Sequence, residues 1–266
     1  MDKVALIAGG GILPLEFIRS AKKTDDKVVV FALNKMASPE LDKEADKIYW
    51  LDIGQYAKFV FFIMKERVRK LAFIGKVDKS IIYKEKKQDD QTREGLKTLK
   101  DKKDYSIMEE ITRRLKQVGI EVIDGKKYLS HLLAEKGLLS KTTPDERIEE
   151  DIEFGFETAK KLAGMDIGQT VVVKNKTIVA VEAMEGTDAT IDRAGSIAGD
   201  GCVMIKVSRP QQDMRWDVPT VGLETMKKLA ENNFSALAIE SGRMYLVEKD
   251  KFIEMADSSN IAVKAL

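Results

Sequence analysis

The chain has 266 residues, and its 45 basic and 44 acidic side chains nearly cancel, so no net field draws it to nucleic acid or an anionic membrane. One histidine, His131, and one cysteine, Cys202, exclude a metal centre built from several histidines and an intrachain disulfide framework. No apolar run reaches the ~18–20 residues of a membrane span, and the first residues show no signal-peptide pattern. We therefore expect a cytoplasmic protein without a membrane span.

Apolar runs alternate with amphipathic segments through the first 125 residues, which predicts a parallel sheet covered by helices on both faces. The predicted strands are the apolar runs Val4–Ala8, Val28–Leu33, Ile48–Ile53, Leu71–Gly75 and Ile120–Ile123. The predicted helices each have one apolar face and span Leu13–Lys22, Tyr56–Val68 and Ser106–Val118. We expect a Rossmann-like domain over residues 1–139.

The segment from Lys136 to Pro144 predicts a domain boundary near residue 140, and Thr143 with Glu146 predicts the cap of a new helix. The second half, residues 140–266, has a different pattern, in which a hairpin and single strands are mixed with helices. This pattern predicts a smaller mixed-sheet α/β domain. Its predicted helices are Asp145–Ala163, Ala189–Ala198 and Glu224–Asn232. Its predicted strands are the hairpin Thr170–Val173 and Thr177–Glu182, the strand Val203–Val207, and a strand pair formed by Ala236–Glu240 and Tyr245–Glu248.

Gly9–Gly11 follows the first predicted strand, where a dinucleotide-binding fold places its phosphate loop. Pro14 replaces the third glycine of the G-x-G-x-x-G fingerprint, and Asn34 rather than an acid closes the second strand, so a redox cofactor is disfavoured. Contact with a nucleotide or sugar phosphate and a plain strand-to-helix turn both remain open. The candidate ligand contacts at the two strand ends are Gly10, Gly11, Ile12, Leu13, Gly75 and Lys76.

Three carboxylates and a hydroxyl surround a glycine directly after the predicted hairpin, at Glu182, Glu185, Thr187 and Asp188. A bound Mg²⁺ or a basic ligand would relieve the mutual repulsion of the acids. The alternative is that Thr187 or Asp188 simply caps the following helix. Lys206 lies in an apolar strand, where a cation requires a phosphate or one of these acids as its partner.

The loop between Arg209 and Gly222 contains two prolines with interleaved acids and arginines. Such a stiff frame suits metal ligands or phosphate contacts, with Asp213 and Asp217 as the acids. A purely polar connection is the other interpretation.

Four segments resemble the LpxI-type UDP-2,3-diacylglucosamine pyrophosphatases, and the resemblance covers almost the whole chain. They are Ile7–Pro14, Asp166–Gln169, Val181–Asp188 and Arg215–Gly222. The resemblance implies Mg²⁺-dependent hydrolysis of UDP-2,3-diacylglucosamine to UMP and the acylated sugar 1-phosphate, a step of lipid A synthesis. It also implies two domains that hold the ligand between them, and a homodimer. The Arg-x-Asp-x-Pro-Thr-x-Gly pattern puts the family's catalytic aspartate at Asp217, whereas Arg209-Pro210 departs from the family's usual Lys-Pro pair.

Our working hypothesis assigns a role to each candidate. Asp217, Asp188 and Lys206 are the catalytic candidates, and Asp217, Asp188 and Glu185 are the metal-ligand candidates. Besides the glycine loops and Lys76, the substrate-binding candidates are Gln169, Thr187, Arg215 and Thr220. Three alternatives stay open: a pyrophosphatase for another UDP-sugar, a nucleotide-dependent oxidoreductase or sugar-nucleotide transferase, and a non-catalytic binding protein for a nucleotide sugar or lipid precursor. A Nudix hydrolase is excluded because its signature box is missing.

Overall fold

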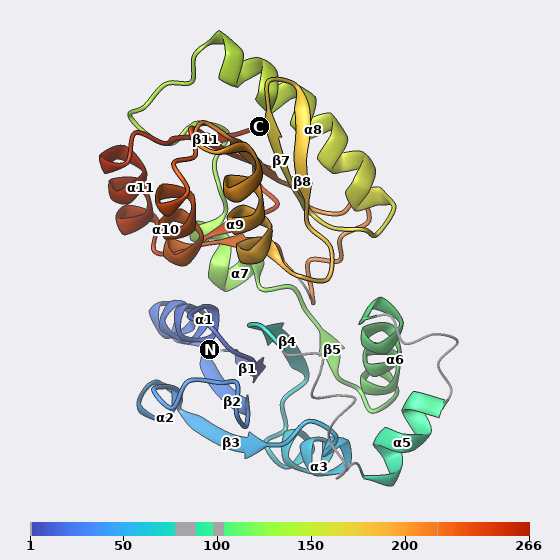
Figure 1. Cartoon of the computed structure of the whole chain (residues 1–266). Helices are drawn as coiled ribbons and strands as arrows, with labels where there is room; N and C mark the ends of the chain where they lie inside the picture. Colours follow the sequence, from blue (N-terminus) through green and yellow to red (C-terminus); the bar gives the residue numbers. More distant parts are fainter. Residues whose placement is uncertain (1, 78–88, 98–103, 217) are drawn as a thin grey trace. The chain divides into compact units, whose positions relative to one another are not determined.

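The computed structural model describes residues 2–77, 89–97, 104–216 and 218–266 (Figure 1). The chain forms two compact units: Met1–Ser130 with the short segment Met214–Asp217, and His131–Asp213 with Val218–Leu266. The sequence-based prediction set the domain change between residues 139 and 140, whereas the units divide between Ser130 and His131. Each unit is an α/β fold around its own sheet, which confirms the predicted fold class.

The first unit contains a five-stranded parallel sheet in the order β3-β2-β1-β4-β5. Its strands are β1 (Lys3–Ala8), β2 (Lys27–Leu33), β3 (Lys47–Leu51), β4 (Lys70–Ile74) and β5 (Glu121–Val122). The strand order reverses between β1 and β4, so this sheet has a topological switch point at their carboxyl ends. Open α/β sheets bind ligands at such points.

Helices cover both faces of this sheet because its strand residues are apolar in both directions. The helices are α1 (Leu13–Lys23), α2 (Leu41–Glu44), α3 (Tyr56–Lys65), α5 (Asp90–Lys97), α6 (Asp104–Gln117) and α7 (Lys126–Leu129). On one face, Phe59 and Ile63 of α3 and Leu115 of α6 join a buried cluster with the strands. On the other, α1 buries Phe17, whose ring lies 4.5 Å from that of Tyr128 in α7.

An ion-pair network joins β1, β3 and the end of α3 around Glu66. The Tyr49 hydroxyl donates to Glu66 Oε1 at 2.6 Å, and Lys3 Nζ donates to Oε2 at 2.9 Å. These two donors, with a smaller contribution from Lys47, lower the pKa of Glu66 to about 2. Glu66 is therefore a charged clamp between three elements of the first unit.

The second unit is built on a six-stranded mixed sheet in the order β6-β13-β11-β9-β7-β8, in which β9, β11 and β13 run parallel. Its strands are β6 (Gly137–Leu138), β7 (Thr170–Lys174), β8 (Thr177–Val181), β9 (Val203–Lys206), β11 (Ala236–Ile239) and β13 (Ala262–Ala265). Its helices are α8 (Glu146–Gly164), α9 (Thr187–Ala198), α10 (Leu223–Glu231) and α11 (Lys249–Ser258), and the single turn η1 (Ser130–Leu132) precedes them.

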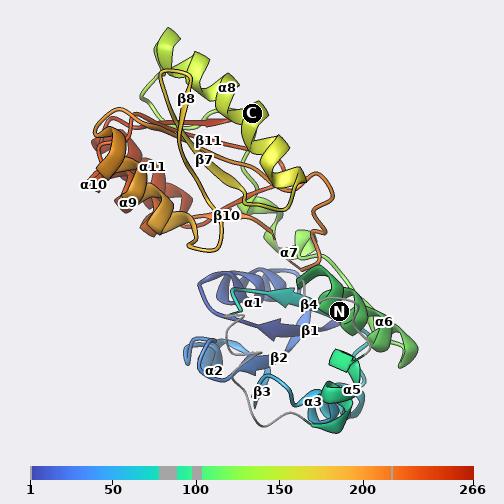
Figure 2. The same ribbon diagram turned by 45° about the vertical axis from the view of Figure 1, so that its right-hand side comes forward.

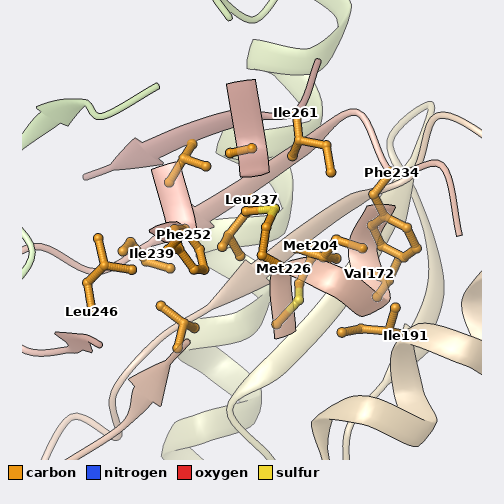
Figure 3. Close-up of a cluster of buried hydrophobic side chains, with 14 of the residues drawn as sticks. Val172, Ile191, Met204, Met226, Phe234, Leu237, Ile239, Leu246, Phe252 and Ile261 are labelled. Carbon is orange, nitrogen blue, oxygen red and sulfur yellow. The ribbon is translucent and has the colours of Figure 1, made fainter. Parts of the chain in front are cut away.

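The helices of the second unit form two layers around the sheet. Figures 1 and 2 show α8 on one face and α9, α10 and α11 on the other. The larger core lies under the three helices, where Met204, Leu237 and Phe252 pack together (Figure 3). Cys202 lies in this core, and burial raises the pKa of its thiol, as expected for a structural residue.

The predicted strand pair and the predicted cap of α8 were both wrong. The predicted strand pair does not form, because β9 and β13 occupy both edges of β11. Instead, β12 (Tyr245–Leu246) pairs in parallel with β10 (Thr220–Val221) in a separate two-stranded sheet. Helix α8 is capped by Asp145, whose side chain accepts from the Ile148 amide at 2.8 Å, and not by Thr143.

Within the described ranges, no helix combines the length and the apolar character needed to cross a bilayer.

Candidate functional site

The two glycine loops of the first unit lie side by side at the switch point of its sheet. The Gly10 amide donates to the Lys76 carbonyl at 2.8 Å, and the Lys76 amide donates back to the Gly10 carbonyl at 2.9 Å. A Cβ at Gly9 would lie 2.4 Å from the Lys76 carbonyl oxygen, and one at Gly75 would lie 2.7 Å from that of Gly10. This backbone-to-backbone contact by itself requires both glycines, whatever ligand the loops bind.

Helix α1 begins immediately after the first loop. Its amino-terminal position, Ile12, supplies no side-chain cap, and Pro14 occupies the first turn. The helix therefore directs its amino end toward the loop, an arrangement that favours an anion. The predicted contacts Gly10–Leu13, Gly75 and Lys76 thus share one edge of the sheet, and their ligand role stays a prediction.

A chain of hydrogen bonds connects three predicted residues of the second unit. Lys206 Nζ, at the end of β9, donates to Thr187 Oγ1 at 2.6 Å. Thr187 Oγ1, at the start of α9, donates to Glu182 Oε1 at 2.8 Å. An ammonium group can only donate and a carboxylate can only accept, so the direction of both bonds is fixed.

Two buried oxygens lie beside this chain without a hydrogen-bond partner in the described part of the protein: Glu182 Oε2 and Thr170 Oγ1. Thr170 of β7 is the register partner of Lys206, and its carbonyl accepts from the Glu182 amide at 2.9 Å. A buried carboxylate oxygen without a donor costs free energy, and a ligand donor or a cation would remove that cost. The site around Lys206 is therefore suited to a polar ligand.

Gly168 permits the close crossing of the chain beside Glu182. A Cβ at this position would lie 1.8 Å from the Glu182 carbonyl oxygen, a distance that no side chain can tolerate. Position 168 in the Asp166–Gln169 segment therefore requires glycine for packing, because the backbone of the site residue Glu182 passes directly beside it.

Glu185 and Asp188 lie close to the start of α9. Glu185 pairs with Arg193 at 2.8 Å and accepts from the Ala183 amide at 3.0 Å, and backbone hydrogen bonds chiefly lower its pKa. Asp188 is exposed in the first turn of the helix, where the helix dipole stabilises a negative charge. The capping interpretation of Thr187 or Asp188 was wrong, because Gly186, with φ 84°, occupies the capping position and no side chain caps the helix.

Two of the three predicted metal ligands, Glu185 and Asp188, lie in the described part of the chain. Among the described residues, no group of three or more His, Cys, Asp or Glu side chains is arranged to hold a metal ion. Asp217, the central member of the predicted set, lies outside the described residues. The remaining acids do not fit a preformed metal centre by themselves, because Arg193 already neutralises Glu185.

The loop that follows β9 is anchored at its first residue. The Ser208 amide and hydroxyl donate to Glu240 Oε2 at 2.8 and 2.7 Å, and Lys160 Nζ of α8 donates to Oε1 at 3.0 Å. Burial raises the pKa of Glu240, but the bonds from Ser208 and Lys160 outweigh it and lower the pKa overall. Arg243 Nε completes the network by donating to the Ser208 hydroxyl at 2.7 Å.

Sequence reasoning missed this anchor. The available signal was a charged residue directly after an apolar strand, because Glu240 follows β11 just as Lys206 ends β9. Side chains at the carboxyl ends of neighbouring parallel strands meet at one sheet edge.

Arg209 connects the same loop to the Asp166–Gln169 segment. Its Nε lies 2.8 Å from Asp166 Oδ1, and its NH1 donates at 3.0 Å to the side-chain oxygen of Gln169 in the amide orientation that satisfies both groups. In that orientation the Gln169 nitrogen donates to the Val207 carbonyl at 3.1 Å. The planar fork of arginine thus engages two partners, which a lysine at this position would not reproduce.

The remaining predicted residues lie further along the loop. The Arg215 guanidinium stacks 5.0 Å from the Trp216 ring, and the Trp216 side chain packs at the edge of the first unit's core. Thr220 Oγ1 donates to the Val218 carbonyl at 3.0 Å at the start of β10.

Comparisons with known proteins cover both units. A model of the LpxI N-terminal domain matches residues 3–132, and a model of the LpxI C-terminal domain matches residues 135–264. The UDP-2,3-diacylglucosamine pyrophosphatase LpxI of Caulobacter vibrioides is 28% identical to this chain over an alignment of 282 positions. The alignment covers 99% of this chain and 97% of that protein.

Similarity to solved structures is low. The biotin carboxylase domain of 2-oxoglutarate carboxylase from Hydrogenobacter thermophilus aligns with a TM-score of 0.29 and 14% identity, over 74% of this chain and 41% of that chain. N5-carboxyaminoimidazole ribonucleotide synthetase from Thermotoga maritima aligns with a TM-score of 0.25 and 16% identity, over 68% and 42%. Neither likeness carries a structural or functional argument.

Proposed function

Because the chain belongs to the LpxI family, we propose that it hydrolyses the pyrophosphate of UDP-2,3-diacylglucosamine to UMP and 2,3-diacylglucosamine 1-phosphate. The observation that carries the proposal is the end-to-end match to a pyrophosphatase of that name, which spans 99% of this chain. Following the family resemblance, we further propose a cytoplasmic homodimer that holds the ligand between its two domains and acts in lipid A synthesis.

Lys206 is the proposed electrostatic stabiliser of the leaving phosphate. The Thr187 hydroxyl holds its ammonium group at 2.6 Å, and Glu182 holds the hydroxyl at 2.8 Å. A charge fixed before the reaction needs no reorganisation when negative charge develops, which is the largest single contribution in many enzymes.

Asp217 is the proposed catalytic carboxylate, on the strength of the sequence pattern alone, and it would orient or deprotonate the attacking water. Arg215 is the proposed second cation at the phosphate, and Asp188 the proposed second carboxylate. The loops Gly10–Leu13 and Gly75–Lys76 are proposed to contact the nucleotide or sugar, because the amino end of α1 favours an anion there.

Mg²⁺ is the proposed cofactor, and its chemistry would be to neutralise charge on the pyrophosphate oxygens. Of the predicted ligands, Glu185 is engaged by Arg193, and the described acids form no three-ligand group. We therefore assign no step of the reaction to the ion.

The proposal is tested by measuring UMP release from UDP-2,3-diacylglucosamine in the presence of Mg²⁺. Asp217→Ala is expected to lower kcat at least about 100-fold, and Lys206→Met about 100-fold. Near wild-type turnover by Asp217→Ala would end its catalytic assignment. Absence of UMP release by the wild-type protein under any divalent metal would refute the proposed reaction.

A matched control is available on the neighbouring strand, at the end of the strand pair that is opposite to Lys206. Lys174 ends β7, which runs antiparallel to β9, and its Nζ donates to the carbonyls of Ala198 and Asp200 at 2.7 Å. Lys174→Met removes the same charge from a strand end, so it is expected to retain activity within about threefold.

A further inference from the structure

The outward face of α3 is apolar and basic. Phe61 and Met64, three positions apart, expose 63% and 53% of their surfaces. Lys58 and Lys65 are exposed on the same face, and the helix Tyr56–Lys65 contains no acid. Single exposed apolar side chains are ordinary on protein surfaces, but two large ones flanked by cations on one helix face are typical of helices that lie on membranes.

The remainder of the helix holds this face rigidly. Phe59 and Ile63 are buried in the core of the first unit. Asp89 accepts from the Ala57 amide at 2.7 Å and so satisfies a donor at the amino end of the helix. Because the helix is already folded and fixed, presenting Phe61 and Met64 requires no ordering on binding.

The charges around the face favour an anionic partner. Neither Lys58 nor Lys65 forms an ion pair within the part of the chain that the structure describes. Asp90 of the neighbouring helix α5 is paired with Arg93 at 3.4 Å, which reduces its repulsion of an anionic surface. The chain's net charge of +1 supplies no long-range attraction, so any association depends on this local face.

We propose that the face formed by Ala57, Lys58, Phe61, Met64 and Lys65 docks on the surface of an anionic lipid bilayer. The inference rests on the proposed function, because a substrate with two acyl chains is held in a bilayer. A second copy of this chain is a poorer occupant, since a two-fold interface through this face would bring its lysines against the same lysines of the partner. Lipid headgroups of negative charge pair with those lysines, while Phe61 and Met64 insert among the acyl chains.

The test is co-sedimentation of the full chain with vesicles of phosphatidylglycerol and phosphatidylcholine, or of phosphatidylcholine alone. At low salt, the wild-type protein is expected to bind the mixed vesicles at least about tenfold more strongly than the vesicles of phosphatidylcholine alone. High salt should weaken its binding to the mixed vesicles. Phe61→Ser with Met64→Ser should lower that binding at least about tenfold, as should Lys58→Glu with Lys65→Glu. The matched control, Met165→Ser with Ile197→Ser, changes two side chains that are 69% and 65% exposed elsewhere and should bind as the wild type does.

UMP release from substrate in detergent micelles separates this proposal from the proposed function. The Phe61→Ser/Met64→Ser variant should keep wild-type kcat/KM in micelles while losing vesicle binding. Absence of sedimentation by the wild-type protein, or undiminished sedimentation by that variant, overturns the docking proposal and leaves the reaction standing. A change from dimer to monomer in that variant, measured by light scattering, would instead identify the face as a subunit interface and also overturn it.

Discussion

Thr187→Val is the sharpest perturbation of the hydrogen-bond chain at Lys206. Valine keeps the shape of threonine, so no cavity forms, but the hydroxyl that joins an ammonium to a carboxylate is lost. Hydrogen bonds to charged groups contribute about 1.5–3 kcal/mol each. Because the site is only part-buried and water can replace some of the loss, we expect about 2 kcal/mol for the two bonds together.

Hydrogen exchange measured by mass spectrometry provides the assay. A loss of about 2 kcal/mol corresponds to about thirtyfold faster exchange of protected amides in α9 and β9. Peptides from β1 of the first unit serve as the internal reference. The control is Thr158→Val in α8, which removes a hydroxyl that donates to the Phe154 carbonyl of the same helix at 2.9 Å. This control should change the exchange of the α8 amides less than about twofold.

Two outcomes would contradict this reasoning. If hydrogen exchange in α9 of the variant stays within about twofold of the wild type, the hydrogen bonds from Lys206 to Thr187 and from Thr187 to Glu182 contribute no stability. Equal effects of Thr187→Val and Thr158→Val would mean that the charges at both ends are irrelevant. A Glu182→Gln background supplies the double-mutant cycle, in which the cost of Thr187→Val should fall by about half because one of its partners is then neutral.

Three further predictions follow from the packing and the charges. Glu240→Gln weakens the anchor of Ser208, so we expect kcat to fall about tenfold with KM nearly unchanged, measured by UMP release; a parallel loss of folded protein by circular dichroism would contradict a positioning role. Gly168→Ala places a Cβ 1.8 Å from a backbone oxygen, and should lower stability by about 2–4 kcal/mol, measured as Tm by calorimetry. Glu66 has a pKa of about 2 in the folded chain, below its ordinary value of 4.5, so its stabilisation is present above about pH 4.5 and disappears as the pH falls toward 2. Urea unfolding of Glu66→Gln should therefore differ from the wild type at pH 7 and converge with it near pH 2; a constant difference would refute the assignment.

The long elements were predictable because their residues obey a single period. The strand prediction Val28–Leu33 and the helix prediction Leu13–Lys22 each agree within one residue with β2 and α1. Buried parallel strands are apolar throughout, and a helix with one apolar stripe has no competing pattern. The two-residue strands were not predictable, because β10 and β12 are too short to carry a period and their pairing depends on the tertiary fold.

The sequence predicted which residues belong to the candidate site, and their roles stay predictions; it did not predict the contacts between them. The local chemistry of the sequence indicated Glu182, Thr187 and Lys206, and the structure joins these three residues by hydrogen bonds. Sequence spacing could not reveal that Arg193 would reach back to Glu185, or that Glu240 would hold the loop after β9. Such contacts depend on side-chain direction across the fold, which a linear pattern does not encode.

The return of Met214–Asp217 to the first unit bears on how related chains can be recombined. A chimaera with one crossover between Ser130 and His131 would combine a first unit from one parent with the Trp216 of the other. That tryptophan packs against the first unit's core, so a mismatch there acts as a core substitution and costs about 1–3 kcal/mol. Exchange of intact units needs additional crossovers on either side of the short segment. The segment Met214–Asp217 should therefore come from the same parent as residues 1–130, although it is encoded within the second half of the gene.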